Sequence, residues 1–279
     1  MTTLLVAAAA ALPAHADSTR SAQWFLQELR VAEAQKISTG AGITVAVIDT
    51  GVNAQHQDLR GSVLPGLDVV HGETGNGWSD SDGHGTSMVG LIVAHGHNGG
   101  GAEGVAPGAR VLPIRGAGEP GDTTAMMARA IDLAVQHRVG VISISAAAGP
   151  SDAVDLAVNR ALARDVVVVA AAGNTPPDLA VDSPARISGV VAVGAVDRNG
   201  NHAAISVTGP QITLSAPGVD IVSTSNTGGY SIGTGTSDAT AIVAGAVALV
   251  RSRFPNMPAT EVIHRLTATA IDKGPPGRD

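Results

Sequence analysis

The sequence predicts a three-layer α/β fold, in which a mainly parallel central sheet is covered by helices on both faces. The runs Ile43–Asp49 and Val166–Ala170 are continuously β-branched or small, which is typical of strands buried on both sides. Helix-compatible stretches separate the strand-like runs, as parallel strands require. The length of 279 residues suits one large domain better than two.

The elements follow from hydrophobic periodicity and turn residues, taken in chain order. Residues 17–36 form a polar, helix-compatible stretch that we expect to pack on the domain as a surface arm. The strands expected after it are 43–49, 67–70, 110–115, 139–145, 166–170, 190–196, 205–207 and 212–214. The helices expected between and after them are 84–95, 123–137, 154–164, one that follows Ser237, and 259–270.

The composition narrows the function classes. Aromatic residues make up only 2% of the chain against 44% hydrophobic residues in total, so the core must consist mainly of Ala, Val, Ile and Leu. The net charge is −7 and no basic block occurs, so nothing indicates a nucleic-acid partner. The chain has no cysteine, which excludes disulfides and thiolate metal sites.

The first 16 residues resemble a secretory signal peptide. The apolar run Leu4–Leu12 is followed by Ala14-His-Ala16, a small-residue cleavage pattern. The start Met1-Thr2-Thr3 lacks the usual Lys or Arg, and an alanine-rich helix start is the alternative interpretation. No later segment reaches transmembrane length. We therefore predict a signal peptide at 1–16 and a secreted or extracytoplasmic, membrane-associated protein.

The glycine-rich turn at 233–235 delivers Ser237 to the start of a helix of very small residues. A helix with this composition packs closely against its neighbours in the middle of a protein. The N–H groups at its N-terminus are unpaired and carry partial positive charge, so they can bind an oxyanion beside the serine. The alternative is that Ser237 is only an N-cap residue.

Ligand sites of parallel sheets lie beyond the carboxyl ends of the strands. This rule selects Asp49, the loop 145–149 and Asn174. Together with His84 and Ser237, which each open a helix, Asp49 makes up the three groups of nucleophilic acyl transfer. In such a set the carboxylate orients the imidazole, and the imidazole takes the serine proton. The side chain of Asn174 and the backbone N–H of Ser237 can then form the oxyanion hole.

Four blocks in this order resemble the signatures of the subtilisin-like serine proteases, peptidase family S8. They are Asp49-Thr-Gly-Val52, Asp82-Gly-His-Gly-Thr86, Ala171-Ala-Gly-Asn174 and Gly235-Thr-Ser-Asp-Ala239. The resemblance covers about residues 40–270 and implies a subtilisin-like peptidase domain at 40–279. It also implies a serine endopeptidase that acts on extended polypeptides without a cofactor or metal. The substrate-binding residues that it implies are Ser145, Ala146, Ala147, Ala172 and Gly173.

Within this family the chain is most similar to the mycosins, the proteases of actinobacterial type VII secretion. The segments that carry this likeness are Trp24-Phe-Leu-Gln-Glu-Leu29, Val111-Leu-Pro-Ile-Arg115, Val168–Asn174 and Ala248–Pro255. The likeness implies a type VII secretion membrane complex as partner. It also implies an N-terminal arm at 17–39, of which residues 17–36 are expected to lie across the active-site cleft. Mycosins usually end in a transmembrane helix, which this sequence lacks, so we expect it to be either a fragment or a truncated member.

Three departures from the family pattern favour a competing hypothesis, a catalytically weak or inactive domain that serves as a structural part of a secretion complex. Ala241 replaces a usual proline, Asp238 replaces an apolar residue, and Ala146–Ala148 replaces Leu-Gly-Gly. The charge of Asp238 suits a helix N-terminus but opposes a nearby oxyanion.

The remaining polar candidates have weaker functional interpretations. Asp80 and Asp82 can be read as a calcium site, although a solvated loop is the favoured alternative. His95-Gly-His97 has no nearby carboxylate in sequence, which favours the end of a helix over a metal site. We read His56 as structural.

Overall fold

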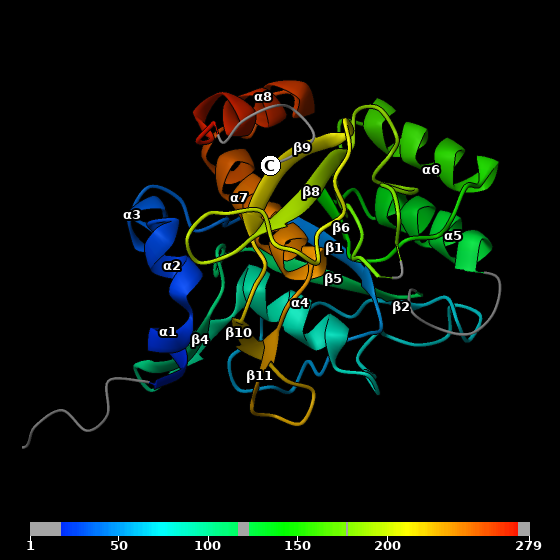
Figure 1. Ribbon diagram of the computed structural model, residues 1–279. Helices are drawn as coiled ribbons and strands as arrows, with labels where there is room; N and C mark the ends of the chain where they lie inside the picture. Colours follow the sequence, from blue (N-terminus) through cyan, green and yellow to red (C-terminus); the bar gives the residue numbers. More distant parts are fainter. Residues whose placement is uncertain (1–17, 117–122, 177, 273–279) are drawn as a thin grey trace, which may run out of the picture.

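The computed structural model describes residues 18–116, 123–176 and 178–272 of the chain (Figure 1). The predicted signal peptide, residues 1–16, lies outside the described residues. The described helices include none with the length and hydropathy that crossing a membrane requires.

The centre of the fold is a seven-stranded sheet with the order β2-β5-β1-β6-β7-β8-β9, and every neighbouring pair is parallel. This arrangement confirms the predicted fold class. The strands are β1 (Thr44–Asp49), β2 (Leu67–Asp68), β5 (Arg110–Arg115), β6 (Val141–Ile144), β7 (Val167–Ala171), β8 (Val191–Val196) and β9 (Ile212–Pro217).

Helices cover both faces of this sheet (Figure 1). One layer holds α4 (His84–Val93), α7 (Thr236–Arg253) and α8 (Ala259–Thr269), and the other holds α5 (Thr123–Gln136) and α6 (Asp152–Ala163). Side chains of a strand point alternately to the two layers. On β1, Val45 and Val47 belong to the core under α4 and α7, whereas Ala46 and Ile48 belong to the core under α5 and α6. This two-sided burial explains why the strand sequences are continuously apolar.

The small residues of α7 let it run close to its neighbours. Ala241, Ala244 and Ala248 are fully buried. At Gly245, a Cβ atom would lie 2.7 Å from Cβ of Val105, closer than two carbon atoms pack. Because α7 contacts most of the central strands, its composition fixes how near its first turn lies to their carboxyl ends.

Two hairpins were not predicted from the sequence. One pairs β3 (His95–His97) with β4 (Gly100–Glu103), and the other pairs β10 (Ile221–Thr224) with β11 (Tyr230–Gly233). Their strands are short and rich in Gly, Ser and His, so they lack the apolar signal of the central sheet. Conversely, the strand expected at 205–207 is wrong, because only Ser206 forms an isolated bridge there.

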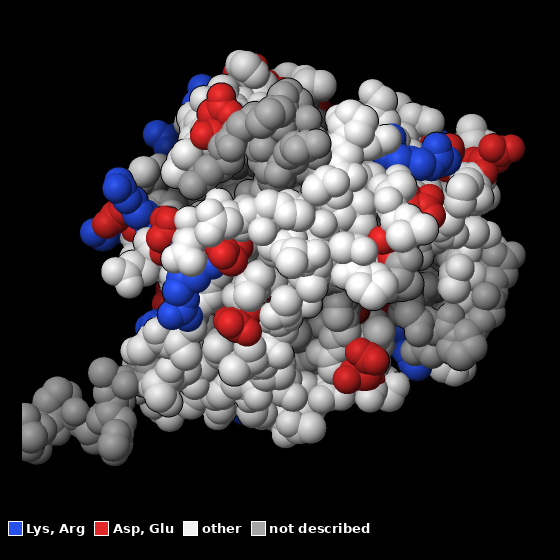
Figure 2. All heavy atoms as spheres, in the orientation of Figure 1, with Lys and Arg blue, Asp and Glu red and all other residues white. Residues whose placement is uncertain are grey.

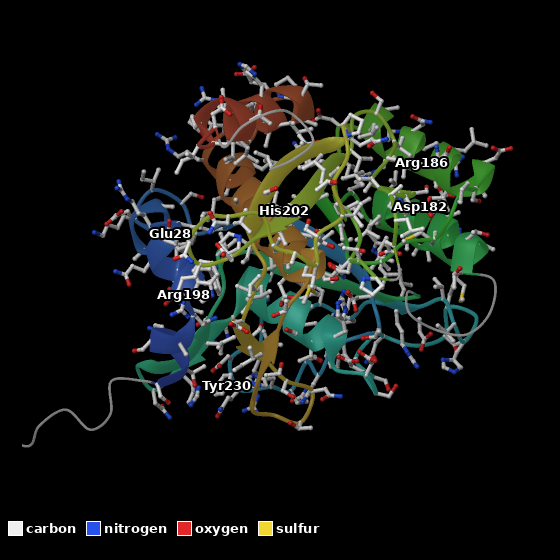
Figure 3. The ribbon with its side chains drawn as sticks, in the orientation of Figure 1. Glu28, Asp182, Arg186, Arg198, His202 and Tyr230 are labelled. Carbon is white, nitrogen blue, oxygen red and sulfur yellow. The ribbon has the colours of Figure 1, made fainter. Side chains whose placement is uncertain are left out.

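The N-terminal arm consists of three short helices, α1 (Ser18–Ala22), α2 (Trp24–Glu28) and α3 (Val31–Gln35). Phe25 is fully buried, and the amide of the buried Gln23 donates to the carbonyls of Glu103 and Val222. The guanidinium of Arg198, which is labelled in Figure 3, lies 5.5 Å from the centroid of the Trp24 ring. The arm is therefore anchored to the flank of the domain near β4 and β10.

Figure 2 shows one face of the molecule. Lys, Arg, Asp and Glu lie mainly around the edge of this view, and uncharged side chains occupy most of its middle. Ion pairs such as that of Arg186 with Asp155 account for part of the charged edge on the α6 side.

Candidate active site

Three neighbouring strands deliver polar groups to one edge of the sheet. In the order β1, β6, β7, their carboxyl ends lead into Asp49, Ser145 and Asn174. Helices α4 and α7 begin at the same edge, with His84 and Ser237 in their first turns. The structure therefore brings together the residues that the sequence selected.

His84 and Asp49 form an ion pair. Nδ1 of His84 lies 2.7 Å from Oδ1 of Asp49. The same oxygen accepts a hydrogen bond from the backbone N–H of Thr50 at 2.8 Å, and Asp49 is 3% exposed. Because Asp49 holds Nδ1, the other ring nitrogen, Nε2, faces away from the carboxylate and into the site. No described residue forms a hydrogen bond with Nε2.

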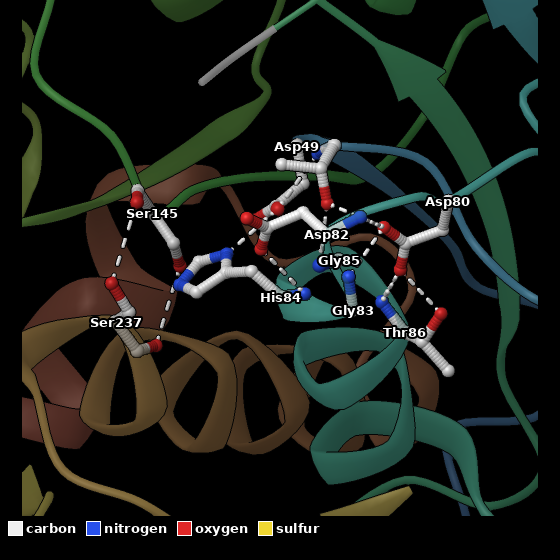
Figure 4. A network of polar contacts seen from close by, with 10 residues as sticks. Asp49, Asp80, Asp82, Gly83, His84, Gly85, Thr86, Ser145 and Ser237 are labelled. Atoms are coloured by element: carbon white, nitrogen blue, oxygen red, sulfur yellow. Dashed lines mark hydrogen bonds and ion pairs between the residues drawn. The ribbon is translucent and has the colours of Figure 1, made fainter. Parts of the chain in front are cut away.

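A second carboxylate, Asp80, fixes the start of α4 (Figure 4). Oδ1 of Asp80 accepts from Oγ1 of Thr50 at 2.9 Å and from the N–H of Gly83 at 2.8 Å. Oδ2 accepts from the N–H of Thr86 at 2.9 Å and from its hydroxyl at 2.5 Å. Asp80 thus bonds both the helix start and the Asp49–Thr50 turn, so it holds His84 against Asp49.

Close backbone approach is also required here. Gly83, the residue before the helix, has a φ of 100°, a left-handed conformation that glycine adopts readily. A Cβ atom on Gly85 would lie 2.1 Å from the carbonyl oxygen of Gly51. The glycines that flank His84 therefore let α4 begin directly against the turn that follows β1.

The charges around His84 favour its protonated form. Burial alone lowers the pKa of an imidazole, but the adjacent Asp49 and, further away, Asp238 and Asp82 raise the pKa of His84 to about 9. Burial raises the pKa of Asp238 to about 7, although the attraction of His84 opposes this rise.

Ser237 lies in the first turn of α7 and is 8% exposed. Gly235 is the N-cap residue, so the interpretation of Ser237 as a simple N-cap is wrong. The Ser237 hydroxyl donates to the carbonyl of Ser145 at 3.3 Å, and the Ser145 hydroxyl donates to the carbonyl of Ser237 at 3.3 Å. Both bonds are long for O–H···O contacts, so the serine hydroxyl is held weakly. In Figure 4 the imidazole of His84 lies between Asp49 and Ser237.

Asn174 is oriented by the helix start. Its Oδ1 accepts from the backbone N–H of Thr236 at 2.9 Å and from the Thr236 hydroxyl at 3.2 Å. This pattern assigns the oxygen and leaves the Nδ2 group as a donor without a partner among the described residues. Nδ2 and the N–H of Ser237 both lie close to Gly235, which places two donors side by side.

A cavity of about 290 Å³ lies beside these groups. Its walls include His84, Asn174 and Ser237, together with Asp238 and residues of β11 and the turn after it. The residues of β11 and Ser87 and Met88 of α4 were missed by the sequence reasoning. The sequence signal for this hairpin is the Gly-Gly turn at 228–229, because only the first of its two strands, Ile221–Thr224, is rich in β-branched residues.

The five residues predicted to bind substrate fall into two groups. The N–H and C=O groups of Ala146 and Ala147 form no backbone hydrogen bond to a described residue, and Ala147 is exposed. Ala172 is 1% exposed, its side chain belongs to the core and its N–H donates to Val193. Gly173 donates to the Thr236 hydroxyl and accepts from Val207. The edge at 145–147 is thus open for a peptide, whereas the backbone of 172–173 is already in use.

The other sequence candidates have structural partners. His95 and His97 form β3 and do not end a helix, and Nδ1 of His97 lies 2.5 Å from Oδ1 of the fully buried Asp58. His56 is 1% exposed and bonds Asp58 and Gly229 through its two ring nitrogens, as a structural residue does.

The calcium interpretation of Asp80 and Asp82 gains no support from their contacts. The Asp80 oxygens are engaged by protein donors, and Oδ1 of Asp82 accepts the N–H of His84 at 3.1 Å. In the described part of the chain, no group of three or more His, Cys, Asp or Glu residues could hold a metal ion.

The arm does not cover this site. Its described hydrogen bonds reach residues such as Gly100, Glu103, Gly104 and Val219, none of which lines the cavity. The expectation that residues 18–36 lie across the cleft is therefore wrong. The buried Phe25 and Gln23 give the physical reason, because they fit the flank of the domain.

Comparison with known proteins agrees with this geometry. The profile of the subtilase family (Peptidase_S8) matches residues 40–279. The chain is 37% identical over 243 residues to a thermostable alkaline protease of Halalkalibacterium halodurans, covering 85% of this chain and 64% of that protein. It is 35% identical over 313 residues to mycosin-1 of Mycobacterium tuberculosis, covering 90% of this chain and 68% of mycosin-1. The chain thus spans less than two thirds of the alkaline protease.

A solved structure gives the same result. The serine protease MycP1, described as an essential component of the type VII (ESX-1) secretion system, superposes with a TM-score of 0.82 at 34% identity. The superposition covers 94% of this chain and 85% of that one.

Proposed function

The chain belongs to the subtilase family of serine endopeptidases, and we propose that it hydrolyses peptide bonds with Ser237 as nucleophile, His84 as general base and acid, and Asp49 as the carboxylate that orients His84. The observation that carries this assignment is the 2.7 Å contact between His84 and Asp49 at the edge where Ser237 begins α7. That contact fixes one imidazole nitrogen and leaves Nε2 for the serine proton.

The proposed reaction proceeds through an acyl-enzyme. His84 reacts in its neutral form, which becomes more abundant as the pH rises toward its pKa of about 9, and it takes the proton of Ser237 as Oγ forms a bond to the scissile carbonyl carbon. The imidazolium then gives this proton to the leaving amine as the C–N bond breaks. Water enters, His84 takes its proton, and the acyl group leaves Ser237 as a free carboxylic acid.

Two donors stabilise the charge that develops on the carbonyl oxygen. Thr236 holds the Asn174 amide by its oxygen, so that Nδ2 is available next to the N–H of Ser237. Donors that are fixed before the reaction need no reorganisation at the transition state.

The substrate is proposed to be an extended polypeptide that pairs with the edge at 145–147. The open N–H and C=O groups of Ala146 and Ala147 suit the addition of a strand. Similarity to mycosin-1 and to the MycP1 structure supports a link with type VII secretion and an extracytoplasmic location. The proposed mechanism calls for no cofactor.

The alternative function is a structural subunit with a weak or inactive site. It is favoured by the carboxylate of Asp238 in the cavity and by the absence of a hydrogen bond between Ser237 and His84. Such a protein would keep the fold, but its Ser237 would not react as a nucleophile.

Covalent labelling distinguishes the two functions. A fluorophosphonate probe should modify the protein at Ser237, and labelling should fall by at least about 10³-fold in Ser237→Ala and His84→Ala, because the alkoxide forms only with both groups. Ser225→Ala, in the loop of the β10–β11 hairpin, serves as the matched serine control and should label normally. If folded wild-type protein does not label, the protease assignment is wrong and the structural alternative is favoured.

A further inference from the structure

The cavity beside Ser237 is lined in part by a carboxylate, that of Asp238, which has one unpaired oxygen. Asp238 is 4% exposed, and its Oδ1 forms no hydrogen bond in the described part of the structure. Most buried polar atoms are hydrogen-bonded, so a carboxylate that lines a cavity and has an unpaired buried oxygen points to a ligand group. Among the residues that line this cavity there is no Lys or Arg.

The carboxylate of Asp238 packs against the backbone of Gly233, and both residues line the cavity. The wall next to it is the backbone of Gly233, where a Cβ atom would lie 2.7 Å from Oδ1 and 3.0 Å from Oδ2 of Asp238. The volume of about 290 Å³ far exceeds the roughly 30 Å³ that one water molecule takes up. A long side chain therefore fits between α4 and β11.

The cavity lies on the leaving-group side of the scissile bond. If a substrate pairs its acyl half with the edge at 145–147, that half lies outside the cavity, because no residue of the edge lines it. The cavity is lined instead by His84, Ser87 and Met88 of α4. Since His84 gives its proton to the leaving amine, the peptide beyond the scissile bond extends past His84 and along this wall.

The charges around Asp238 favour a cation from the substrate. His84 is the one nearby group that offsets its charge, and the proposed reaction starts from neutral His84. In that state the carboxylate shares the cavity with Asn174, Ser231 and Thr234, none of which is charged. Ion pairing with a substrate cation would offset the charge of the Asp238 carboxylate.

We propose that Asp238 selects a lysine or arginine as the residue directly after the cleaved bond. This inference rests on the proposed function, and it names the residue that gives this site its substrate preference. It also gives Asp238 a role that an inactive site does not require.

Peptide cleavage tests the preference directly. Two substrate pairs differ only at the residue after the cleaved bond, one with arginine against citrulline and one with lysine against norleucine. We expect wild-type kcat/KM to favour the cationic member at least 10-fold. In Asp238→Asn the ratio should fall to within 2-fold, whereas Asp82→Asn, which removes a carboxylate near His84 but outside the cavity, should keep the wild-type ratio.

Ligand binding tests the same site without cleavage and without a variant. Argininamide and its neutral counterpart citrullinamide are titrated into wild-type protein, and the His84 imidazole resonance is followed by NMR. Argininamide should bind at least 10-fold more tightly, and Asp238→Asn should remove the difference.

The two measurements separate the inference from the proposed function. Cleavage with equal rates for charged and neutral members overturns the inference and leaves the protease function intact. Binding of argininamide that depends on Asp238, in a protein that neither cleaves nor labels, supports the cation site and overturns the protease function. Equal binding of both amides with no cleavage overturns both.

Discussion

The first turns of α4 and α7 meet at the same cavity but are held in different ways. Around His84, the carboxylates of Asp49 and Asp80 receive a dense set of short hydrogen bonds. Around Ser237, the hydroxyl makes a 3.3 Å contact and the carboxylate of Asp238 has an unpaired oxygen. Oδ2 of Asp49 is buried and unpaired as well. The comparison teaches that hydrogen bonds of the fold fix the base, whereas the nucleophile is held weakly beside a carboxylate that lines the cavity.

The largest effect on activity should come from a substitution of Asp49, the carboxylate that contacts His84 at the start of α4. Asp49→Asn keeps the shape of the side chain but favours the wrong imidazole tautomer and no longer stabilises the imidazolium. We expect the rate of peptide hydrolysis to fall by about 10³–10⁴-fold. Asp197→Asn, in a surface loop, is the control and should retain the wild-type rate. A fall of less than about 10-fold in Asp49→Asn would show that Asp49 does not orient His84.

The next largest effect should come from Asp80, whose hydrogen bonds at the start of α4 stabilise the folded protein. Asp80→Ala leaves the donors of Thr50, Gly83 and Thr86 without their acceptor, so we expect the free energy of unfolding to fall by about 2–3 kcal/mol. The adjacent Asp82→Ala removes a single long contact with the N–H of His84 and should cost less than about 1 kcal/mol. Equal losses in the two variants, measured by urea denaturation, would contradict the role assigned to Asp80.

A substitution of Asp238, in the first turn of α7, should increase the stability of the protein, and only at higher pH. Burial raises the pKa of Asp238 from 3.8 to about 7, so the unfolded chain loses this proton first. The destabilisation begins as the pH rises past 3.8 and is complete above about 7. Asp238→Asn should therefore increase the free energy of unfolding at pH 8 by about 1–4 kcal/mol, because one pKa unit corresponds to about 1.4 kcal/mol.

The same variant has an internal control in pH. At pH 3 or below, Asp238 is protonated in the folded protein and mostly protonated in the unfolded chain, so asparagine should change stability very little. Chemical denaturation of both proteins at the two pH values measures this difference. A stability gain of the same size at both values would attribute the effect to packing and not to charge.

Much of the site was predictable because its residues follow local rules. Asp49 and Asn174 come directly after buried strands, and parallel strands place such residues at one edge. His84 and Ser237 were identified from the glycine-rich turns and helix patterns around them, and the four blocks then indicated the family. In the same way, the continuously apolar strand sequences predicted a sheet that is buried on both faces.

The features that were not predicted depend on contacts between distant segments. Asp80 was read as a solvated or calcium-binding residue, since nothing in its own sequence shows that Thr50 and Thr86 turn toward it. The arm was expected over the cleft, but Phe25 and Gln23 bury against the flank. The β10–β11 hairpin, which closes the cavity, has too little apolar pattern to be seen.

The sequence by itself determined the fold class, the order of the elements and the identity of the groups at the sheet edge, because burial and turn chemistry act locally along the chain. Only the tertiary structure decided which polar groups are satisfied and which are left open. Asp49, Asp80 and Asp238 are the same residue type, but Asp49 ends β1, Asp80 lies in the loop before α4, and Asp238 lies in the first turn of α7. Donors from near and distant segments satisfy both oxygens of Asp80 and Oδ1 of Asp49. In the described structure Oδ2 of Asp49 and Oδ1 of Asp238 are both buried and unpaired, and of these two residues only Asp238 lines the cavity.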